Sequence, residues 1–262
     1  MAIPRHWALP RFSLRFAQVW RRNLLVWRKL AIPSMLGNLA DPLLYMFGLG
    51  YGLGRMLEDV GGMSYIGFLA GGVVCSSTMM SASFEAMYSA FSRMHMQKTW
   101  EAILNAPLTL DDVLLGELAW AASKSFLSGS AVLVVAAVLG LVPSCLAFAV
   151  IPLVFLTGLA FAALGLIMTA LSPSYDFFMY YFTLCVTPMM LLCGVFFPLD
   201  QLPAAAQIAA QLLPLTHAVS LARPLLNGEV PSTWLLHIAV LAFYTFAGFY
   251  IALALTRRRL LK

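Results

Sequence analysis

Long apolar runs alternate with short polar loops along most of this chain. A helix rises 1.5 Å per residue, so about 20 residues cross a hydrocarbon core of about 30 Å. Six apolar segments reach roughly this length and are predicted to be transmembrane helices. They cover residues 31–53, 66–90, 114–140, 147–171, 177–197 and 233–255. The pattern predicts an all-α membrane protein with six transmembrane helices, organised as a single domain over residues 1–262.

The first 30 residues have a different, amphipathic pattern. They carry seven basic residues and no acidic one. On a helix, Phe12, Phe16, Val19, Trp20 and Trp27 fall on one face and the basic residues on another. The segment is too long for the basic start of a cleaved signal peptide. Basic helices with an aromatic apolar face lie in the membrane interface, so residues 1–30 are predicted to be an interfacial helix. The alternative is a plain retention signal without a structural role.

Residues 198–227 also depart from the spanning pattern. Their apolar part, 204–213, is too short to cross the membrane and is bounded by prolines. Runs of about 10–14 apolar residues are typical of re-entrant or interfacial segments. We therefore expect short re-entrant helices that dip into the outer leaflet before the last span.

Composition agrees with a membrane location. Hydrophobic residues make up 61% of the chain and charged residues 10%, where soluble domains have roughly 45–50% and about 25%. A soluble domain of this length could not bury so much apolar surface. The net charge of +5 raises nucleic acid as a partner, but the basic residues flank apolar runs, so no nucleic-acid partner is expected.

The basic residues also predict an orientation. With six spans, both termini lie on one side, and 14 of the 16 Lys and Arg residues fall on that side. Only Arg55 and Arg223 fall opposite. Loops rich in Lys and Arg stay in the cytoplasm. The sequence therefore predicts a multi-pass protein of the bacterial inner membrane with both termini cytoplasmic.

No motif for catalysis or metal binding is present. The chain has no Gly-Lys pair and so no phosphate-binding P-loop, and it lacks HExxH and G-x-S-x-G patterns. The four cysteines form no CxxC pair and are interpreted as small core hydrophobes. No catalytic residue, metal site or cofactor is predicted. Energy for any uphill transport must come from an ion gradient or from a partner ATPase.

The loop between the second and third predicted spans carries a short helix candidate. Residues Lys98–Leu104 are predicted to be helical and to stop before Pro107, because a proline disfavours helix at the preceding residue. Thr109 and Asp112 then form a capping pattern for the next helix. Such an element, over 95–108, is suited to docking in a groove of a soluble partner. The alternative is an ordinary polar connection.

Several stretches of the sequence closely resemble ABC-2 type permeases of the NodJ kind, and the likeness runs along nearly the whole chain. The stretches are Ser83–Tyr88, Thr99–Leu104, Leu115–Ala122, Gly37–Pro42, Gly48–Gly54, and Gly194–Pro198 with Leu202 and Pro203.

The resemblance implies an exporter with two permeases and two cytoplasmic ATPase subunits of the NodI kind, which would bind the ATP and Mg²⁺. A single permease type suggests a homodimer. The implied cargo is amphiphilic, with lipo-chitooligosaccharide as the named example, although the wider group exports drugs, polysaccharides and lipids. The cargo path would lie between the two copies, mainly along the second and fifth spans. The loop after the second span would couple to the ATPase. Its candidate contact residues are Lys98, Thr99, Trp100, Glu101 and Leu104.

Ionisable residues inside predicted spans are further candidates, because they are costly in lipid and usually face a partner or water. Glu85, Arg93, Glu117 and Lys124 form a possible transmembrane charge network, with Glu85 and Lys124 either a structural ion pair or part of a gate. Asp41 has two readings, a helix-kink or packing role and a cargo-path role.

Two aromatic pairs complete the possible cargo path. They are Tyr180 with Tyr181 and Phe196 with Phe197, which could contact an acyl chain or a sugar.

Two other function classes stay open. A gradient-driven transporter needs an ion site near the midplane, often in repeated halves; no repeat is evident, and Asp41 is the isolated acidic candidate. A membrane scaffold could use the same docking loop without transport. A membrane enzyme is least supported, because no set of polar catalytic groups converges at one level.

Overall fold

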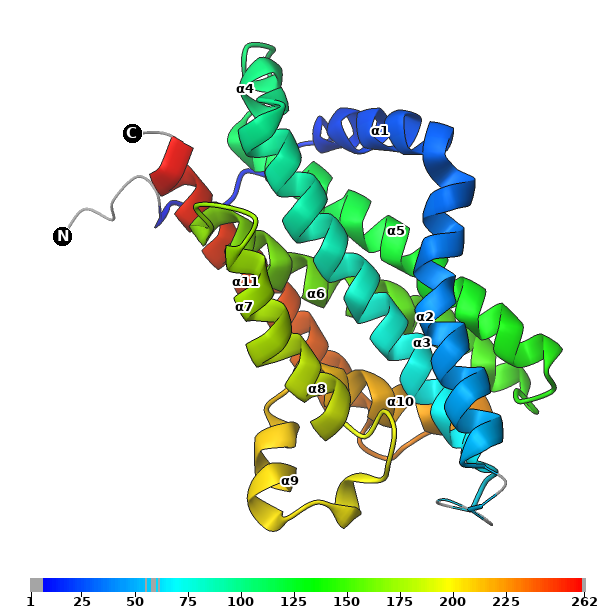
Figure 1. The fold of residues 1–262 in the computed structure, drawn as a ribbon. Helices are drawn as coiled ribbons and strands as arrows, with labels where there is room; N and C mark the ends of the chain where they lie inside the picture. The colour runs from blue at the N-terminus through cyan, green and yellow to red at the C-terminus, as the bar shows by residue number, and fades with distance from the viewer. Residues whose placement is uncertain (1–6, 55, 58–59, 61, 261–262) are drawn as a thin grey trace.

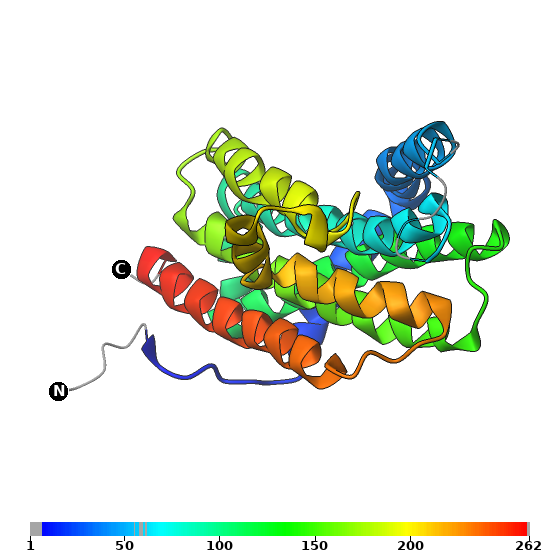
Figure 2. The same cartoon turned by 90° about the horizontal axis from the view of Figure 1, so that it is seen from below.

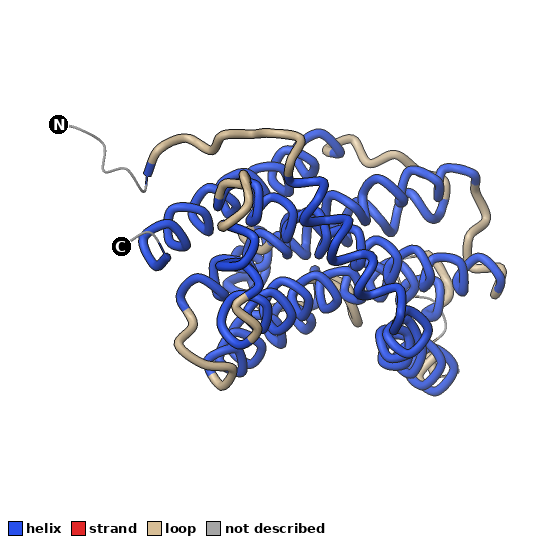
Figure 3. Tube along the Cα trace, turned by 90° about the horizontal axis from the view of Figure 1, so that it is seen from above, coloured by secondary structure: helices blue, strands red, loops and turns tan. Residues whose placement is uncertain are grey.

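The computed structural model describes residues 7–54, 56–57, 60 and 62–260. Arg5, Arg55 and Lys262, which entered the orientation argument, lie outside these residues. The described chain is helical, and its only bridge of the β type is an isolated pair between Val60 and Met63 (Figure 3). The α-helices are α1 (Phe16–Trp27), α2 (Ala31–Gly52), α3 (Tyr65–Phe84), α4 (Thr99–Leu104), α5 (Leu110–Val138), α6 (Val150–Leu171), α7 (Phe177–Tyr181), α8 (Thr187–Leu192), α9 (Ala204–Gln211), α10 (Pro214–Asn227) and α11 (Trp234–Leu260).

Within the described residues, four helical stretches are long and apolar enough to cross a membrane. They are Tyr65–Met96, Leu110–Val138, Cys145–Leu171 and Trp234–Leu260. They coincide with the second, third, fourth and sixth predicted spans. Helix α2 matches the first predicted span in position, but Asn38, Asp41 and Pro42 make it less apolar. The fifth predicted span is a shorter apolar helix, Phe177–Leu192. The six-span arrangement therefore stays a prediction.

The fifth predicted span ends earlier than expected. The chain leaves the helix after Leu192, and Gly194 has a φ of +74°. A positive φ is a conformation that glycine adopts readily and other residues do not. Phe196 and Phe197 consequently lie in a non-helical segment rather than at the end of a span.

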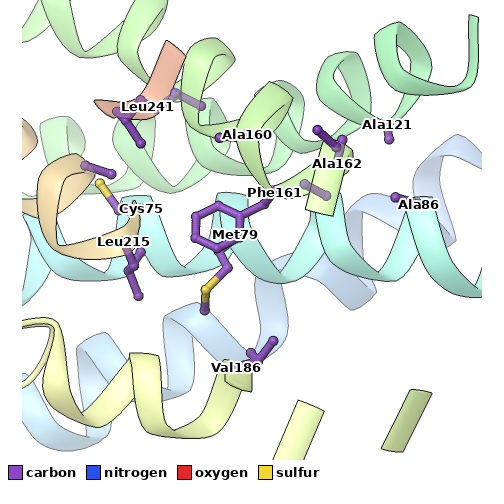
Figure 4. Close-up of a cluster of buried hydrophobic side chains, with 14 of the residues drawn as sticks. Cys75, Met79, Ala86, Ala121, Ala160, Phe161, Ala162, Val186, Leu215 and Leu241 are labelled. Carbon is purple, nitrogen blue, oxygen red and sulfur yellow. The ribbon is translucent and has the colours of Figure 1, made fainter. Parts of the chain in front are cut away.

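Helix α3 is the centre of the bundle. It packs against α2, α5, α6 and α10, while α11 packs along α6 and α10 (Figure 2). The core between these helices contains Phe161, Met79, Cys75 and Leu215, which Figure 4 shows gathered around α3. Two of the four cysteines, Cys75 and Cys193, are buried. The small residues on α6, such as Ala160 and Ala162, allow close helix approach.

The N-terminal segment differs in part from its prediction. Helix α1 begins only at Phe16, and residues 9–13 have no regular structure. Phe12, expected on the apolar helix face, therefore lies ahead of the helix. The aspartates at the start of α5 hold this segment outside a helix. Ser13 Oγ donates to Asp112 at 2.6 Å, and the Arg11 amide donates to Asp111 at 2.8 Å. Helix α1 itself lies across one end of the bundle (Figure 1).

The two ends of the bundle carry different elements. Helices α1 and α4 lie at one end, together with both ends of the described chain (Figure 1). A hydrogen bond from Tyr250 Oη to the Trp7 carbonyl joins the start of the described chain to α11. Helix α9 lies at the opposite end (Figure 1). The predicted short helices within 198–227 are α9 and α10, which follow Pro203 and begin at Pro214. Pro224 does not end α10 and lies inside it.

The contact between α1 and α5 depends on Gly116. A Cβ at this position would lie 2.6 Å from Val19 Cβ and 2.9 Å from the Phe16 carbonyl oxygen. One of these contacts is backbone, so a side-chain rotation cannot relieve it. The absence of a side chain at Gly116 lets α1 rest directly on α5.

We expect Gly116→Ala to lower the free energy of unfolding by about 1–3 kcal/mol, the usual cost of overpacking. Thermal unfolding of the purified protein in detergent measures this change. The matched control is Gly48→Ala, because nothing lies within 4 Å of a Cβ at Gly48. The control should be neutral or stabilising by up to about 1 kcal/mol. An equal melting temperature for both variants would contradict the close α1–α5 contact.

Candidate functional site

Four charged side chains meet in a buried cluster near the α4 end of the bundle. Glu85 and Arg93 come from two π-helical segments, Glu85–Ser89 and Ser92–Met96, that continue α3. Glu117 and Lys124 come from α5. The Arg93 guanidinium lies 2.9 Å from Glu85 and 2.5 Å from Glu117, and Lys124 Nζ lies 2.8 Å from Glu85. The structure thus brings together all four residues of the possible charge network, including the Glu85–Lys124 ion pair.

Two tryptophans complete the hydrogen bonding of the carboxylates. Trp120 Nε1 donates to Glu85 at 2.8 Å, and Trp100 Nε1 donates to Glu117 at 3.1 Å. Glu85 and Glu117 are only 3% and 1% exposed. Burial of a charge is costly unless it is paired and hydrogen-bonded, and both carboxylates meet this condition. The cluster therefore joins α3 and α5 by ion pairs and α4 by the hydrogen bond from Trp100. Loss of the Arg93–Glu117 ion pair would leave the buried Glu117 charge without a cationic partner.

Trp100 was expected on the surface of the coupling element, and the structure corrects this. Its side chain is 1% exposed and belongs to the hydrophobic core. The reason is chemical: a buried indole needs an acceptor for its N–H, and Glu117 provides one. The Trp100 indole therefore cannot be a surface contact in this conformation.

The other candidates on the same element remain accessible to different degrees. Lys98 and Glu101 are exposed, and Thr99 and Leu104 are partly buried. Lys98 has a φ of +50°, an uncommon backbone conformation for a residue other than glycine. It forms the turn that separates α4 from the π-helical end of α3. The expected capping box of the next helix is confirmed, because Thr109 and Asp112 exchange both hydrogen bonds.

A cleft between α2, α3 and α8 holds three of the cargo-path candidates. One cavity of about 330 Å³ is lined by Asp41, Asn38 and several serines of α3. Pro42 adds to its polarity, because a proline inside a helix leaves the carbonyl four residues earlier, that of Asn38, without its usual donor. An adjoining cavity of about 590 Å³ is lined by Phe196 and Phe197. Tyr45 and Met190 line both cavities, so the two lie side by side.

The tyrosine pair does not belong to this cleft. Tyr180 is 64% exposed on α7, Tyr181 is buried, and neither lines the two cavities. Adjacent residues on a helix point about 100° apart, so the two rings cannot share one surface. Of the aromatic candidates, only Phe196 and Phe197 border the cleft.

Several polar contacts were not predicted from the sequence. Arg257 pairs with Asp111 at 2.6 Å, although Arg257 had been considered only for orientation and Asp111 had been given no role. Arg223 stacks on Phe68 at 3.6 Å and donates to the carbonyls of Phe68 and Gly194, which holds α10 against α3. In the sequence, this contact could have been suspected only because Arg223 is an isolated charged residue among apolar neighbours.

The sequence matches a known family of membrane proteins. A family model for the ABC-2 type transporter matches residues 15–227, most of the chain. The chain belongs to the ABC-2 type transporter family. The match covers the charge cluster, α4 and the cleft, whereas α11 lies beyond it. The expected resemblance is confirmed, and the protein is an integral membrane permease component of an ABC transporter.

Individual relatives agree with this assignment. The permease is 50% identical over 255 residues to Nodulation protein J of Rhizobium leguminosarum bv. trifolii, across 97% of each chain. It is 49% identical over 254 residues to Nodulation protein J of Rhizobium meliloti (strain 1021), again across 97% of each chain. It is 25% identical over 205 residues to Inner membrane transport permease YadH of Escherichia coli (strain K12), across 77% of this chain and 78% of that one.

Glu117→Gln tests how far the permease depends on the cluster. The change keeps the shape but removes one of two carboxylates that neutralise Arg93. Removing one partner of a buried ion pair typically costs about 3–5 kcal/mol, so we expect a loss of stability of this order. Thermal unfolding in detergent provides the measurement. Glu101→Gln, on the exposed face of α4, is the control and should change stability by no more than about 0.5 kcal/mol. Equal stability of the two variants would show that the buried cluster is energetically unimportant.

Proposed function

We propose that this permease is the transmembrane subunit of an ATP-driven exporter of an amphiphilic cargo, such as a lipo-oligosaccharide or another glycolipid. In this proposal two copies form a homodimer in the bacterial inner membrane with two NodI-like cytoplasmic ATPases. ATP and Mg²⁺ bind the ATPases, and this chain holds no nucleotide. The similarity to Nodulation protein J relatives extends over 97% of each chain, which supports a shared role.

The proposed orientation places α1, α4 and both termini at the cytoplasmic face. The exposed basic residues of α1 and of the α11 end lie at the same end of the bundle as α4, which supports this orientation. Helix α2 and the Phe177–Leu192 helix complete six spans, and α9 with α10 form the re-entrant segment at the outer face. A coupling element must face the ATPase, and α4 is then on the correct side.

The link from α4 to the buried charges is the observation that carries the proposal. Lys98, just before α4, and Glu101 on α4 are exposed, while Trp100 on the inner face of α4 donates to Glu117. Glu117 binds Arg93, and Arg93 binds Glu85 at the end of α3. A push on α4 by an ATPase therefore acts directly on the ion pairs between α3 and α5. Helix α3 also borders the cleft, so this route connects ATP hydrolysis to the cargo path.

The cleft suits an amphiphile because its two parts differ in chemistry. The cavity beside Asp41 is bordered by hydroxyl and amide groups, and the cavity beside Phe196 and Phe197 is mainly apolar. A sugar or other polar group matches the first and an acyl chain matches the second. Helices α2, α3 and α8 border this cleft, and the family's expected path along the second and fifth spans uses two of them.

Charge reversal on α4 tests the coupling. We expect Glu101→Arg to lower permease-stimulated ATPase activity several-fold, because it reverses a charge on the exposed face without disturbing Trp100. Trp100→Phe keeps the packing but removes the hydrogen bond to Glu117, so it should leave ATPase binding intact and reduce stimulation by cargo. Co-purification with the ATPase and cargo-stimulated ATP hydrolysis separate the two effects.

The control for these variants is Glu229→Arg, an equal charge reversal at an exposed site near the α9 end. It should bind and stimulate the ATPase as the native chain does. If the stable, purified permease retains no ATPase at all, the exporter proposal fails in favour of a scaffold or a gradient-driven transporter. If Glu101→Arg behaves like the control, α4 is not the contact.

Asp41 distinguishes an ATP-driven path from a gradient-driven one. Its carboxylate borders the polar cavity, a position also suited to a coupling ion. We expect Asp41→Asn to shift cargo preference while ATP-dependent transport in vesicles persists. Uncoupler-sensitive transport by the native chain that is lost in Asp41→Asn would instead assign Asp41 to an ion site. Transport of radiolabelled glycolipid into inverted vesicles, with and without an uncoupler, measures both.

A further inference from the structure

A separate cavity of about 250 Å³ lies between α1, the start of α2 and the charge cluster. Its volume is far above the roughly 10–15 Å³ that a single water requires. Arg22, Asn23 and Val26 line it from α1, and Arg93 and Lys124 line it from the cluster. It is distinct from the cleft beside Asp41, with which it shares no lining residue.

Asn23 identifies the kind of atom that this cavity would bind. The side chain is 3% exposed, and its Nδ2 is buried without a hydrogen-bond partner among the described residues. The orientation of the amide is fixed, because Oδ1 accepts a hydrogen bond from Arg22 at 2.9 Å. The unsatisfied atom is therefore the donor. A buried donor without a partner costs about 1–3 kcal/mol, and a ligand oxygen would remove this cost.

The charges around the cavity favour an anion. Arg93 and Lys124 are neutralised by Glu85 and Glu117, but Arg22 makes no ion pair among the described residues. Burial and the neighbouring Arg93 lower the pKa of the Arg22 guanidinium, and Glu117 raises it. A second hollow continues along α1 through Arg22 and Val26 and adds Arg21 and Lys29. The lining thus holds five cations against one carboxylate in direct contact, Glu85, which is already paired.

The position of the cavity favours a lipid over a free anion. Helix α1 lies across the end of the bundle, as an interfacial helix does at the level of lipid head groups (Figure 1). Val26 and Leu30 line the cavity and are also exposed on the surface, so an acyl chain has an apolar surface to follow.

We propose that this cavity binds the anionic phosphate head group of an inner-leaflet phospholipid, with Asn23 Nδ2 and Arg22 as its ligands. The bound lipid joins α1 and α2 to the α3–α5 charge cluster. The site does not depend on the export proposal, because it is tested without cargo or ATPase.

The experiment uses the full-length permease, purified in a neutral detergent and stripped of lipid. Binding of phosphatidylglycerol, phosphatidylcholine and inorganic phosphate is measured by native mass spectrometry and by the shift in melting temperature. Arg22→Gln removes the unpaired cation, and Asn23→Leu replaces the unsatisfied amide by an apolar group of similar size. Arg28→Gln is the control, because Arg28 is exposed and lines neither hollow.

We expect the native chain and Arg28→Gln to bind phosphatidylglycerol at least about tenfold more tightly than phosphatidylcholine, because both lipids carry the phosphate but the choline ammonium would lie among the cations of the lining. Arg22→Gln and Asn23→Leu should each lose this preference. Asn23→Leu should melt no lower than the native chain without lipid, which keeps the test valid if Arg22→Gln does not fold.

Three results would overturn the proposal. Equal preference for phosphatidylglycerol in all four proteins would show that the cavity is not the site. Equal losses in Arg22→Gln and Arg28→Gln, with none in Asn23→Leu, would show diffuse surface attraction. Inorganic phosphate that binds as tightly as phosphatidylglycerol would assign the cavity to a free anion.

Discussion

Neutralisation of two carboxylates buried between helices is the constraint on which this structure depends. Glu85 and Glu117 lie inside stretches that are otherwise apolar enough to span a membrane. An ionised carboxylate is stable there only with cations and hydrogen-bond donors in contact. Arg93 contacts both carboxylates, so α3 cannot separate from α5 without leaving buried charge. The same requirement brings in Trp100, and through it α4. The proposed coupling surface is thus held in place by the electrostatics of the core rather than by its own six-residue helix.

The π-helical segments of α3 are explained by this constraint. Glu85 and Arg93 are eight residues apart, which in a uniform α-helix rotates one about 80° from the other around the axis. A π-helical turn contains more residues and so turns less per residue. The segments Glu85–Ser89 and Ser92–Met96 therefore bring Arg93 back towards the face that carries Glu85. Wider turns of this kind cost backbone stability and often mark functional positions. Here they place one guanidinium between two carboxylates on two helices.

Sequence reasoning succeeded where local pattern or composition determines the outcome. Apolar length located four helices that are long and apolar enough to span a membrane. Thr109 and Asp112 identified the start of α5, and the ionisable residues of two of these helices were the ones that meet. It was wrong where a tertiary contact decides. A tryptophan beside a glutamate on a six-residue loop helix has no local signal for its direction, and the acceptor that turns Trp100 inward lies 17 residues away. The start of α1 was misplaced for the same reason, because Asp111 and Asp112 bind the residues before it. The position of Phe196 and Phe197 outside a helix follows from the end of α8 at Leu192, just before Gly194 with its positive φ, which no periodicity indicated.

Residues near the N-terminus and near the C-terminus both bind the beginning of α5. These contacts determine how α4, which precedes α5, can move. Ser13 contacts Asp112, Arg257 contacts Asp111, and Arg15 donates to the Pro107 carbonyl at 2.6 Å. The C-terminal side of α4 is therefore attached to a rigid point where the N-terminal arm, α5 and α11 meet. Its N-terminal side joins the π-helical end of α3 through Lys98, whose positive φ marks a strained turn. A force applied to α4 must consequently be taken up on the Lys98 side. In the proposed coupling, motion of α4 reaches Glu117 through Trp100 and Arg93 through the Lys98 turn, and the Arg93–Glu117 ion pair joins the two routes. Helix α3, which borders the cleft, then carries this motion towards the proposed cargo path.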